Sequence, residues 1–289
     1  MMEIYINDIF DIFNIEKTQL NINVVKSIIV AMISKKLCTE NKQKIKFDSS
    51  IFILLWEIYL NSLEHFDPNY NRKTDFSLFF KKIINSLYNN DKLEFHALFC
   101  PGYTQYGYKD HLGNTTLWKL KELLDIKKTF GNFGLIPEVI CYYSDVFLEN
   151  CNYALEKNWP EQLKMNRNLF HKEANKYFES CCVKNMSDIE LFSHGYDIEG
   201  FVDKKIISEI SKTTYNAFKK SNERFYKKMG FSEEQIQFRN DRLITMYKMF
   251  SNYLNEKSNA VFLPMENMYE RENIFSENKT CVMYLKLKR

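Results

Sequence analysis

The chain has 289 residues, which is enough for one large domain or two small ones, and 45% of them are hydrophobic, which excludes an intrinsically disordered polypeptide. Its 40 basic and 37 acidic residues leave a net charge of +3, so any basic surface that could bind nucleic acid must be local. The 8 glycines and 5 prolines disfavour an all-β sandwich, and long helices are expected instead.

The cysteines and the first residues favour a reducing compartment. The seven cysteines are odd in number and include no Cys-x-x-Cys pair, so we expect free thiols in a cytoplasmic protein. The opening stretch, MMEIYINDIFDIF, carries acidic residues where a signal peptide carries basic ones. The longest apolar runs, 28–33 and 51–56, are far shorter than the roughly 20 residues of a membrane span, so no membrane association is expected.

The first 90 residues form a predicted helical section. Apolar residues recur at spacings of three and four through 1–36, 49–64 and 75–89, which is typical of amphipathic helices. The sequence Asp67-Pro68-Asn69 predicts a turn between the second and the third of these helices.

A strand, a helix and a second strand follow this section. Residues 93–99 are short, apolar and bounded by turn residues, which predicts a buried strand. A helix is predicted over 115–129 and is expected to end at Gly131. Residues 137–143 predict the next strand. Because a helix connects the two strands, we expect a βαβ unit with parallel strands.

The second half of the chain is predicted to be mostly helical. Residues 160–256 read as a helical insertion with polar faces, and two late strands are predicted over 259–264 and 279–288. Breaks in the helical insertion are expected near 185–188, 195–200 and 230.

The order of these elements predicts the fold class. No repeat, low-complexity tract or long linker divides the chain, so we expect one α/β domain over 1–289. Its helical section covers 1–90. Its core, over 91–289, is expected to contain a Rossmann-like, mostly parallel sheet flanked by helices.

The connection between the first strand and its helix, residues 99–116, is the best candidate for a ligand site. The strand ends at glycines, and the N-terminus of the next helix points back at them with free N–H groups that suit a carboxylate or a phosphate. Ligands of open parallel sheets also bind beyond the carboxyl ends of the strands. The segment is neither a GxGxxG nor a P-loop sequence, and a connecting loop whose glycines serve only turns is the alternative. The candidate groups are Gly102, Tyr103, Thr104, Lys109, His111 and Asn114.

Carboxylates follow two other predicted strands. Asp145 comes directly after the strand over 137–143, where it can bind a substrate ammonium or act as a general base; a capping role is the alternative. A cluster over 266–272, after the strand over 259–264, could hold an amine or a metal, or could be a solvated loop; its candidate residues are Glu266, Tyr269 and Glu270. No set of His and Cys residues has zinc-ligand spacing, so neither a metal nor a cofactor is expected.

A local basic stretch lies at 204–228, with eight Lys or Arg residues against two Glu. Lys205, Lys212 and Lys219 are spaced by seven and are predicted to share one helix face. Such a stripe can follow the phosphate backbone of a tRNA. The alternative is a solvated helix face with no partner.

Three segments between residues 90 and 150 give the chain a resemblance to a known family. The segments are EFHALFCPGYT, TTLWKLKELLDIKKTF and EVICYYSDVFLEN. Their layout resembles that of the tyrosine/tryptophan isonitrile synthases, in which a strand ends in a small-residue and Lys motif, and a helix and a strand ending in Ser-Asp follow. The match covers about a fifth of the chain. The family's Lys-Ser-x-Asn core is replaced here by Gly102-Tyr103-Thr104.

Two further families are similar at the same level. In the tRNA-dependent cyclodipeptide synthases a Gly-x-Ser follows the first strand of a Rossmann-like sheet, and Gly102-Tyr103-Thr104 would take its place. Their later Tyr and Glu pair resembles Tyr253 and Glu256, with one residue fewer between them. The sequence His111-Leu-Gly-Asn114 is similar to the HIGH motif of class I aminoacyl-tRNA synthetases. All three resemblances imply an amino-acid substrate on a Rossmann-like sheet.

These observations predict a small biosynthetic transferase that acts on an α-amino acid or an aminoacyl donor, as isonitrile and cyclodipeptide synthases do. Thr104, Lys109 and His111 would line the reactive centre, and Asp145 with the 266–272 cluster would hold the amine of the substrate. A non-enzymatic, cytoplasmic protein that binds a ligand or a partner is the alternative, because no complete catalytic motif is present.

Overall fold

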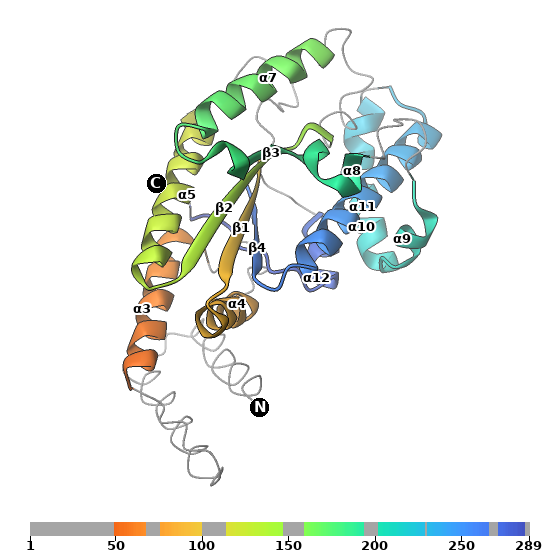
Figure 1. The fold of residues 1–289 in the computed structure, drawn as a ribbon. Coiled ribbons are helices and arrows are strands. Elements are labelled where there is room, and N and C mark those ends of the chain that lie inside the picture. The colour runs from red at the N-terminus through yellow and green to blue at the C-terminus, as the bar shows by residue number, and fades with distance from the viewer. Residues whose placement is uncertain are drawn as a thin grey trace, which may run out of the picture.

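The computed structural model describes residues 49–67, 76–99, 114–146, 159–193, 202–228, 230–265 and 271–286. At its centre lies a four-stranded, all-parallel sheet with the strand order β3-β2-β1-β4 (Figure 1). The strands are β1 (Lys92–Phe99), β2 (Ile136–Tyr143), β3 (Val183–Asn185) and β4 (Ala260–Pro264). The predicted α/β fold class is therefore confirmed.

The register brings the carboxyl ends of the three longer strands to one edge of the sheet. The pairing of β1 with β2 runs from Lys92 opposite Ile136 to Phe99 opposite Tyr143. The pairing of β1 with β4 ends where Leu98 lies opposite Pro264. The strands are buried on both faces, as expected of a parallel sheet covered by helices on its two sides.

One face of the sheet carries the first apolar cluster. Alternate strand residues such as Phe95, Phe99, Val139 and Val261 point to this face because side chains in a strand alternate between its two sides. Helical residues such as Phe79, Leu123 and Phe170 complete the cluster. The helices that supply it are α3 (Ser49–His65), α4 (Phe76–Asn89), α5 (Asn114–Asn132) and α7 (Trp159–Ala174).

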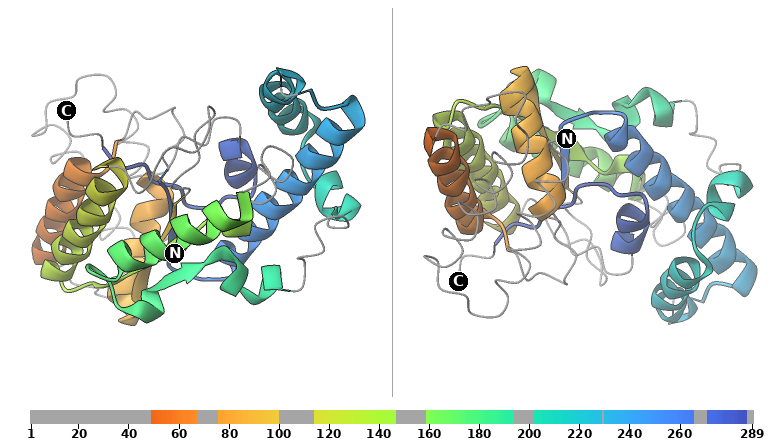
Figure 2. Two further views of the ribbon diagram at one scale, coloured as in Figure 1. Left: turned by 90° about the horizontal axis from the view of Figure 1, so that it is seen from above. Right: turned by 90° about the horizontal axis from the view of Figure 1, so that it is seen from below.

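The opposite face carries the second apolar cluster, in which Leu98, Tyr142 and Phe262 pack against Phe250 and Phe275. Figure 2 shows α3 and α5 side by side at one side of the molecule and the pair α10 and α11 at the other. The elements on this side are α8 (Glu190–Ser193), α9 (Lys204–Ser208), α10 (Lys212–Lys228), α11 (Glu233–Asn255) and α12 (Glu272–Glu277).

The connections between strands change direction once. The chain passes from β1 through α5 to β2 and through α7 to β3, and both helices lie on the first face. It then returns through α11, on the opposite face, to place β4 on the other side of β1. Because parallel crossovers are right-handed, a change of direction along the sheet requires a change of face. The strand order therefore reverses between β1 and β4.

Most predicted elements are confirmed. The predicted strands over 93–99, 137–143 and 259–264 correspond to β1, β2 and β4, and the predicted helices over 49–64 and 75–89 correspond to α3 and α4. The predicted helix over 1–36 lies outside the described residues, as does most of the predicted turn over 67–69. No helix in the described parts of the chain is both long and apolar enough to cross a membrane.

Two predicted boundaries are wrong. The helix α5 does not end at Gly131 but continues to Asn132, and Gly134 is the residue with the positive φ, 78°. The segment 279–286 forms no continuous strand, because its backbone hydrogen bonds are divided between two partners. Met283 donates to Phe262 of β4, whereas Lys286 donates to His65 at the end of α3.

No pattern in the sequence predicted β3. The strand has three residues and lies between two 3₁₀ turns, η3 (Ser180–Cys182) and η4 (Met186–Asp188). A run of three residues is too short to show the alternation that identifies a strand. The break that the sequence predicts near 185–188 is real and corresponds to η4.

Candidate functional site

The reversal of strand order places two chain segments with candidate residues at neighbouring points of the sheet. The ends of β1 and β4 are hydrogen-bonded, since the backbone N–H of Met265 donates to the carbonyl of Leu98 at 3.1 Å. From these two ends the chain continues into residues 100–113 and 266–270. In open parallel sheets, the carboxyl edge at such a reversal is where ligands bind.

The sequence-predicted residues fall into two groups with respect to the structure. Eight of them lie outside the described residues: Gly102, Tyr103, Thr104, Lys109, His111, Glu266, Tyr269 and Glu270. Two belong to described elements at the carboxyl edge. Asn114 is the first residue of α5, and Asp145 follows β2.

Asp145 is 2% exposed and makes three hydrogen bonds within the protein. Its Oδ1 accepts from the backbone N–H of Val146 at 3.0 Å and of Ser187 at 3.2 Å, and its Oδ2 accepts from the Ser187 hydroxyl. Burial raises the pKa of the Asp145 carboxyl, and the hydrogen bonds from Ser187 and Val146 oppose that rise. The side chain thereby fixes η4, which follows β3, to the end of β2.

A lysine that the sequence analysis did not single out also reaches the carboxyl edge. Lys119 lies in the second turn of α5, and its ammonium donates to the carbonyl oxygen of Met265, directly after β4. The side chain thus brings a positive charge from the first face of the sheet to the reversal between β1 and β4. Its place in the second turn of the helix after β1 was the only signal in the sequence.

The helix α7 covers the ends of β1 and β2. The ring of Phe170 lies 5.1 Å from that of Phe99 and 5.6 Å from that of Tyr143, measured between centroids. These two partners are the last residues of their strands. Residues of α7 that precede Phe170 by one turn therefore lie beyond the carboxyl edge, because a helix that leads into a parallel strand runs antiparallel to it.

A second group of polar side chains is buried under α11, on the other face of the sheet. The two ring nitrogens of His96 are both occupied: Nε2 lies 2.8 Å from Glu94 Oε2, and Nδ1 lies 3.1 Å from the Tyr142 hydroxyl. The Tyr142 hydroxyl lies 3.5 Å from that of Tyr253, and Lys257 Nζ lies 3.6 Å from Glu94. His96 and Tyr142 are fully buried. We refer to Glu94, His96, Tyr142 and Tyr253 as the histidine cluster.

The pKa shifts indicate the protonation states in the histidine cluster, and these states determine which group donates each hydrogen bond. The hydrogen bond from His96 lowers the pKa of Glu94, and burial lowers the pKa of His96 although Glu94 opposes that change. A charged Glu94 and a neutral His96 require that Nε2–H donates to Glu94 and that Nδ1 accepts from Tyr142. Burial raises the pKa of the Tyr142 hydroxyl, which therefore keeps its proton.

The histidine cluster extends from Glu94, near the amino end of β1, to Tyr142, which precedes the last residue of β2. The backbone N–H of Glu94 donates to the carbonyl of Asn259, which directly precedes β4. Tyr253, from the last turn of α11, therefore approaches the sheet from its amino side. In the parts of the chain that the structure describes, no group of three or more His, Cys, Asp or Glu is placed to hold a metal ion.

The predicted basic stripe is divided between two helices. Lys205 belongs to α9, whereas Lys212 and Lys219 belong to α10. The expectation that all three share one helix face is wrong, because Ser211 ends the connection between these helices. Its hydroxyl accepts from the backbone N–H of Thr214, and its backbone N–H donates to Glu277.

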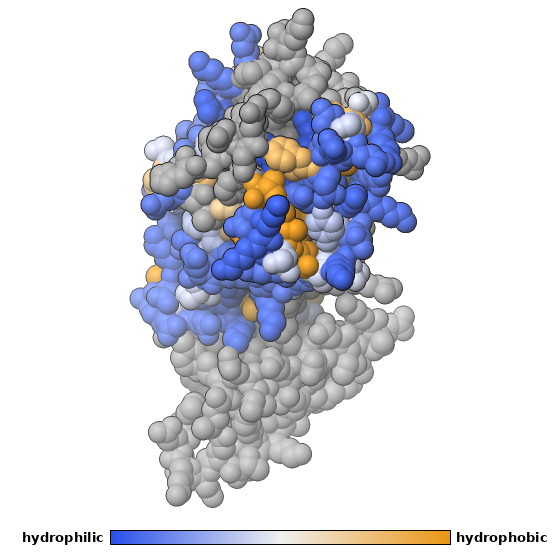
Figure 3. All heavy atoms as spheres, turned by 90° about the vertical axis from the view of Figure 1, so that its right-hand side faces the viewer, coloured by the Kyte–Doolittle hydropathy of each residue, from blue (hydrophilic) through white to orange (hydrophobic). Residues whose placement is uncertain are grey.

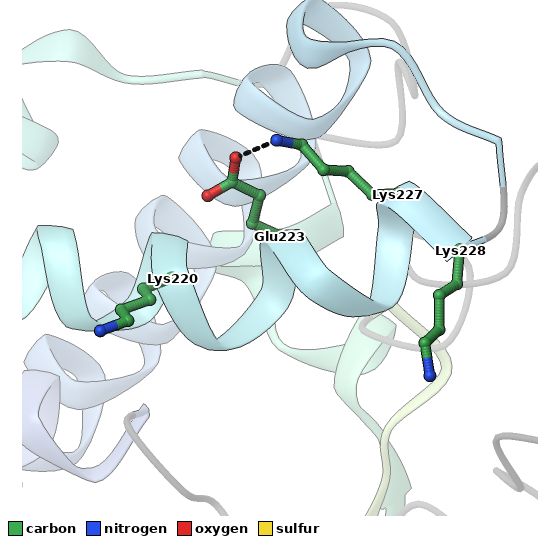
Figure 4. Close-up of a pocket in the computed structure, with 4 residues that line it drawn as sticks. All are labelled: Lys220, Glu223, Lys227 and Lys228. Carbon is green, nitrogen blue, oxygen red and sulfur yellow. Dashed lines mark ion pairs between the residues drawn. The ribbon is translucent and has the colours of Figure 1, made fainter.

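The same helix α10 borders an open hollow of about 640 Å³. The described residues that line it are Lys220, Glu223, Lys227 and Lys228. Figure 4 shows that Lys227 reaches back to Glu223, with which it forms an ion pair of 2.6 Å, whereas Lys220 and Lys228 point away from this pair. Three cations against one carboxylate leave the lining positive.

The surface that carries α9 to α12 is mainly hydrophilic. Figure 3 shows this face with an apolar area near its centre that is bordered by hydrophilic residues. Across the described residues as a whole, four large apolar side chains are exposed, and each belongs to a different element. They are Leu60 of α3, Ile136 of β2, Met165 of α7 and Phe238 of α11. Single exposed apolar residues of this kind are ordinary on protein surfaces.

Comparison with known proteins shows a likeness of fold. No protein-family model matches the chain, and no curated protein matches its sequence. Among solved structures, the chain is similar to the PvcA protein from Pseudomonas aeruginosa, with a TM-score of 0.51 and 10% sequence identity. The alignment covers 80% of this chain and 83% of PvcA. At this identity the likeness is one of fold, over most of both chains.

Proposed function

We propose that the chain is a biosynthetic enzyme of secondary metabolism that resembles the isonitrile synthases and acts on an α-amino acid. Support at the level of the fold comes from PvcA, which is an isonitrile synthase. The layout of residues 90–150 supports the same family from the sequence. The two lines of support differ in kind. The structural likeness concerns the backbone fold over 80% of the chain, whereas the layout concerns the sequence of about a fifth of it.

The observation that carries the proposal is the position of the two candidate segments. Residues 100–113 and 266–270 begin at the hydrogen-bonded ends of β1 and β4, where the strand order reverses. Sheets of this type bind their ligands at that point of the carboxyl edge. In a parallel sheet the segments after all strands lie at this edge, and these two follow the pair of strands between which the order reverses.

The roles of the residues follow from their chemistry. We assign Thr104, Lys109 and His111 to the reactive centre, where a hydroxyl, a cation and a titratable ring can bind and transfer protons. The cluster of Glu266, Tyr269 and Glu270 is assigned to the substrate amine. Asp145 is assigned to the amine through its negative charge and not through a direct hydrogen bond, because its oxygens already accept hydrogen bonds from Ser187 and Val146.

The isonitrile synthase reading is preferred over the cyclodipeptide synthase reading because of Tyr253. The latter would require Tyr253 and Glu256 to face the substrate at the carboxyl edge. The Tyr253 hydroxyl instead lies 3.5 Å from that of Tyr142, and its helix turn lies at the amino side of the sheet. Use of an aminoacyl-tRNA is therefore no part of the proposal.

The test is untargeted mass spectrometry of bacterial cultures that express the wild type and single variants, each fed with every proteinogenic amino acid. Thr104→Ala and Lys109→Ala should lower the amount of a new, amino-acid-derived product at least about 100-fold, as expected when a proton-transfer group is lost. The matched control is Lys121→Ala, an exposed residue of α5.

Each outcome has a definite meaning. A product that only the wild type and the control form supports the proposal, and its mass identifies or excludes an isonitrile. A product that all variants form at the same level shows that the site lies elsewhere. No product from soluble, folded wild type in any culture contradicts the proposed enzyme.

A further inference from the structure

A buried asparagine lies beyond the carboxyl ends of β1 and β2. Asn166 belongs to α7 and precedes Phe170 by four residues, so the two side chains share a face of the helix. Phe170 contacts the last residues of both strands, Phe99 and Tyr143. Asn166 lies one helical turn, about 5.4 Å along the axis of α7, before Phe170, on the side of the carboxyl ends of the strands.

In the part of the chain that the structure describes, the amide oxygen of Asn166 has no hydrogen-bond partner. The residue is 4% exposed, and its Oδ1 is buried. Burial of an unpaired amide oxygen costs free energy, so folded proteins contain few such atoms, and each calls for an explanation by a water, an ion or a ligand. An acceptor without a donor at the carboxyl edge is expected of a side chain whose hydrogen-bond donor belongs to a ligand.

We propose that Asn166 Oδ1 accepts a hydrogen bond from the amino group of the bound substrate, an inference that rests on the proposed function and adds a residue to its site. An amide oxygen can only accept, so its ligand partner must be a donor such as an ammonium. Asp145, the other described acceptor at this edge, already receives three hydrogen bonds from Val146 and Ser187.

Asn166 and Lys119 reach the carboxyl edge on different sides of β1. Asn166 lies on the side of β1 that faces β2, because Phe170 bridges these two strands. Lys119 reaches the opposite side of β1, where its ammonium contacts the carbonyl of Met265 after β4. An ammonium bound at Asn166 would therefore lie on the side of β1 toward Asp145, which follows β2 and which the proposed function also assigns to the amine.

The inference is tested with Asn166→Leu, Asn166→Asp and the matched control Asn168→Leu, which changes an exposed residue of the same helix. Calorimetry with each proteinogenic L-amino acid identifies the one that the wild type binds most tightly. Its des-amino analogue is then measured with every variant. Melting temperatures are recorded without ligand.

Two readouts should move in opposite directions. Asn166→Leu removes an unpaired polar atom, so its melting temperature should equal or exceed that of the wild type. Its affinity for the amino acid should fall about 10–100-fold, whereas its affinity for the des-amino analogue should not change. Asn166→Asp should retain the binding of the amino acid, because a carboxylate accepts from an ammonium at least as well.

The results that overturn the inference are distinct from those that overturn the proposed function. A lower melting temperature of Asn166→Leu with unchanged amino-acid binding shows that Asn166 is structural, with a buried water as its partner, and leaves the proposed function standing. If the wild type binds none of the amino acids, the proposed function fails and the inference fails with it.

Discussion

Two buried polar sites on the same sheet differ in how their hydrogen bonds are satisfied. In the histidine cluster, both ring nitrogens of His96 have partners, and the chain of contacts continues through Tyr142 to Tyr253. At the carboxyl edge, Asn166 buries an amide oxygen without any partner among the described residues. The first site is complete within the folded chain, whereas the second is complete only with a donor from outside.

This difference separates polar groups that hold the fold from polar groups that bind a ligand. A satisfied buried network keeps its members in one arrangement and is costly to disrupt, because each broken bond leaves another buried group without a partner. An unpaired group lowers stability until a ligand arrives. A buried, titratable residue such as His96 therefore does not by itself identify a ligand site. An uncharged residue such as Asn166 can identify one when its buried polar atom has no partner.

The largest expected effect on stability comes from His96→Leu. The substitution leaves the buried Tyr142 hydroxyl without its acceptor, which should lower the free energy of unfolding by about 1–3 kcal/mol. Urea denaturation measures this loss. Amino-acid binding should not change, since both ring nitrogens of His96 already have partners within the protein. The effect is thus opposite to that expected of Asn166→Leu.

The matched control for His96→Leu is His171→Leu. His171 is less buried, and its Nε2 lies 2.9 Å from Asn185 Oδ1 in a single contact between α7 and the end of β3. Its replacement should cost less than that of His96. A His96→Leu variant that keeps wild-type stability but loses ligand binding would reverse the assignment of the two sites.

The framework of the fold could be predicted because it follows from local patterns. The strands β1, β2 and β4 are short apolar runs bounded by turn residues, and α3 and α4 repeat their apolar residues at helical spacing. The reversal between β1 and β4 could not be predicted. It depends on which side of β1 the last strand pairs with, which is a long-range property that no spacing encodes.

The candidate site could be predicted only as a region. The end of β1 and Asp145 at the end of β2 were found because strand ends can be read from the sequence. The contact of Lys119 with Met265 joins residues that are far apart in the chain, so no local signal marks it. Asn166 lies in a polar helix among other asparagines, and only burial distinguishes it from Asn168.

A smaller effect is expected from pH, and it sharpens the same comparison. Burial lowers the pKa of His96 in the folded protein, so below the pKa of an unfolded histidine, about 6.5, the unfolded chain binds more protons than the native one. Stability should therefore fall as the pH decreases below this value. Glu94, whose pKa is lowered by the hydrogen bond from His96, adds a further loss at more acidic pH.

Urea titrations of the wild type and of His96→Leu at several pH values isolate this contribution. The decline that begins near pH 6.5 should be present in the wild type and reduced in the variant. Asp145 has the opposite sign, since its raised pKa makes the native state bind more protons, and it is common to both proteins. Equal slopes in the two titrations would show that His96 does not titrate differently in the native and unfolded states.

The smallest effect on stability is expected where charges are exposed, on α10. Lys212→Ala combined with Lys219→Ala removes one exposed and one half-buried cation and should change the urea midpoint little, because charges at the surface contribute little to stability. If the helix binds tRNA, the same double variant should weaken binding and lower its salt dependence by about two counterions. Lys205→Ala, on the separate helix α9, serves as the control. Binding that is equally strong in the wild type and the double variant at every salt concentration would leave α10 as a solvated face. Exposed charge thus completes the comparison, because it contributes little to folding and acts only on a charged partner.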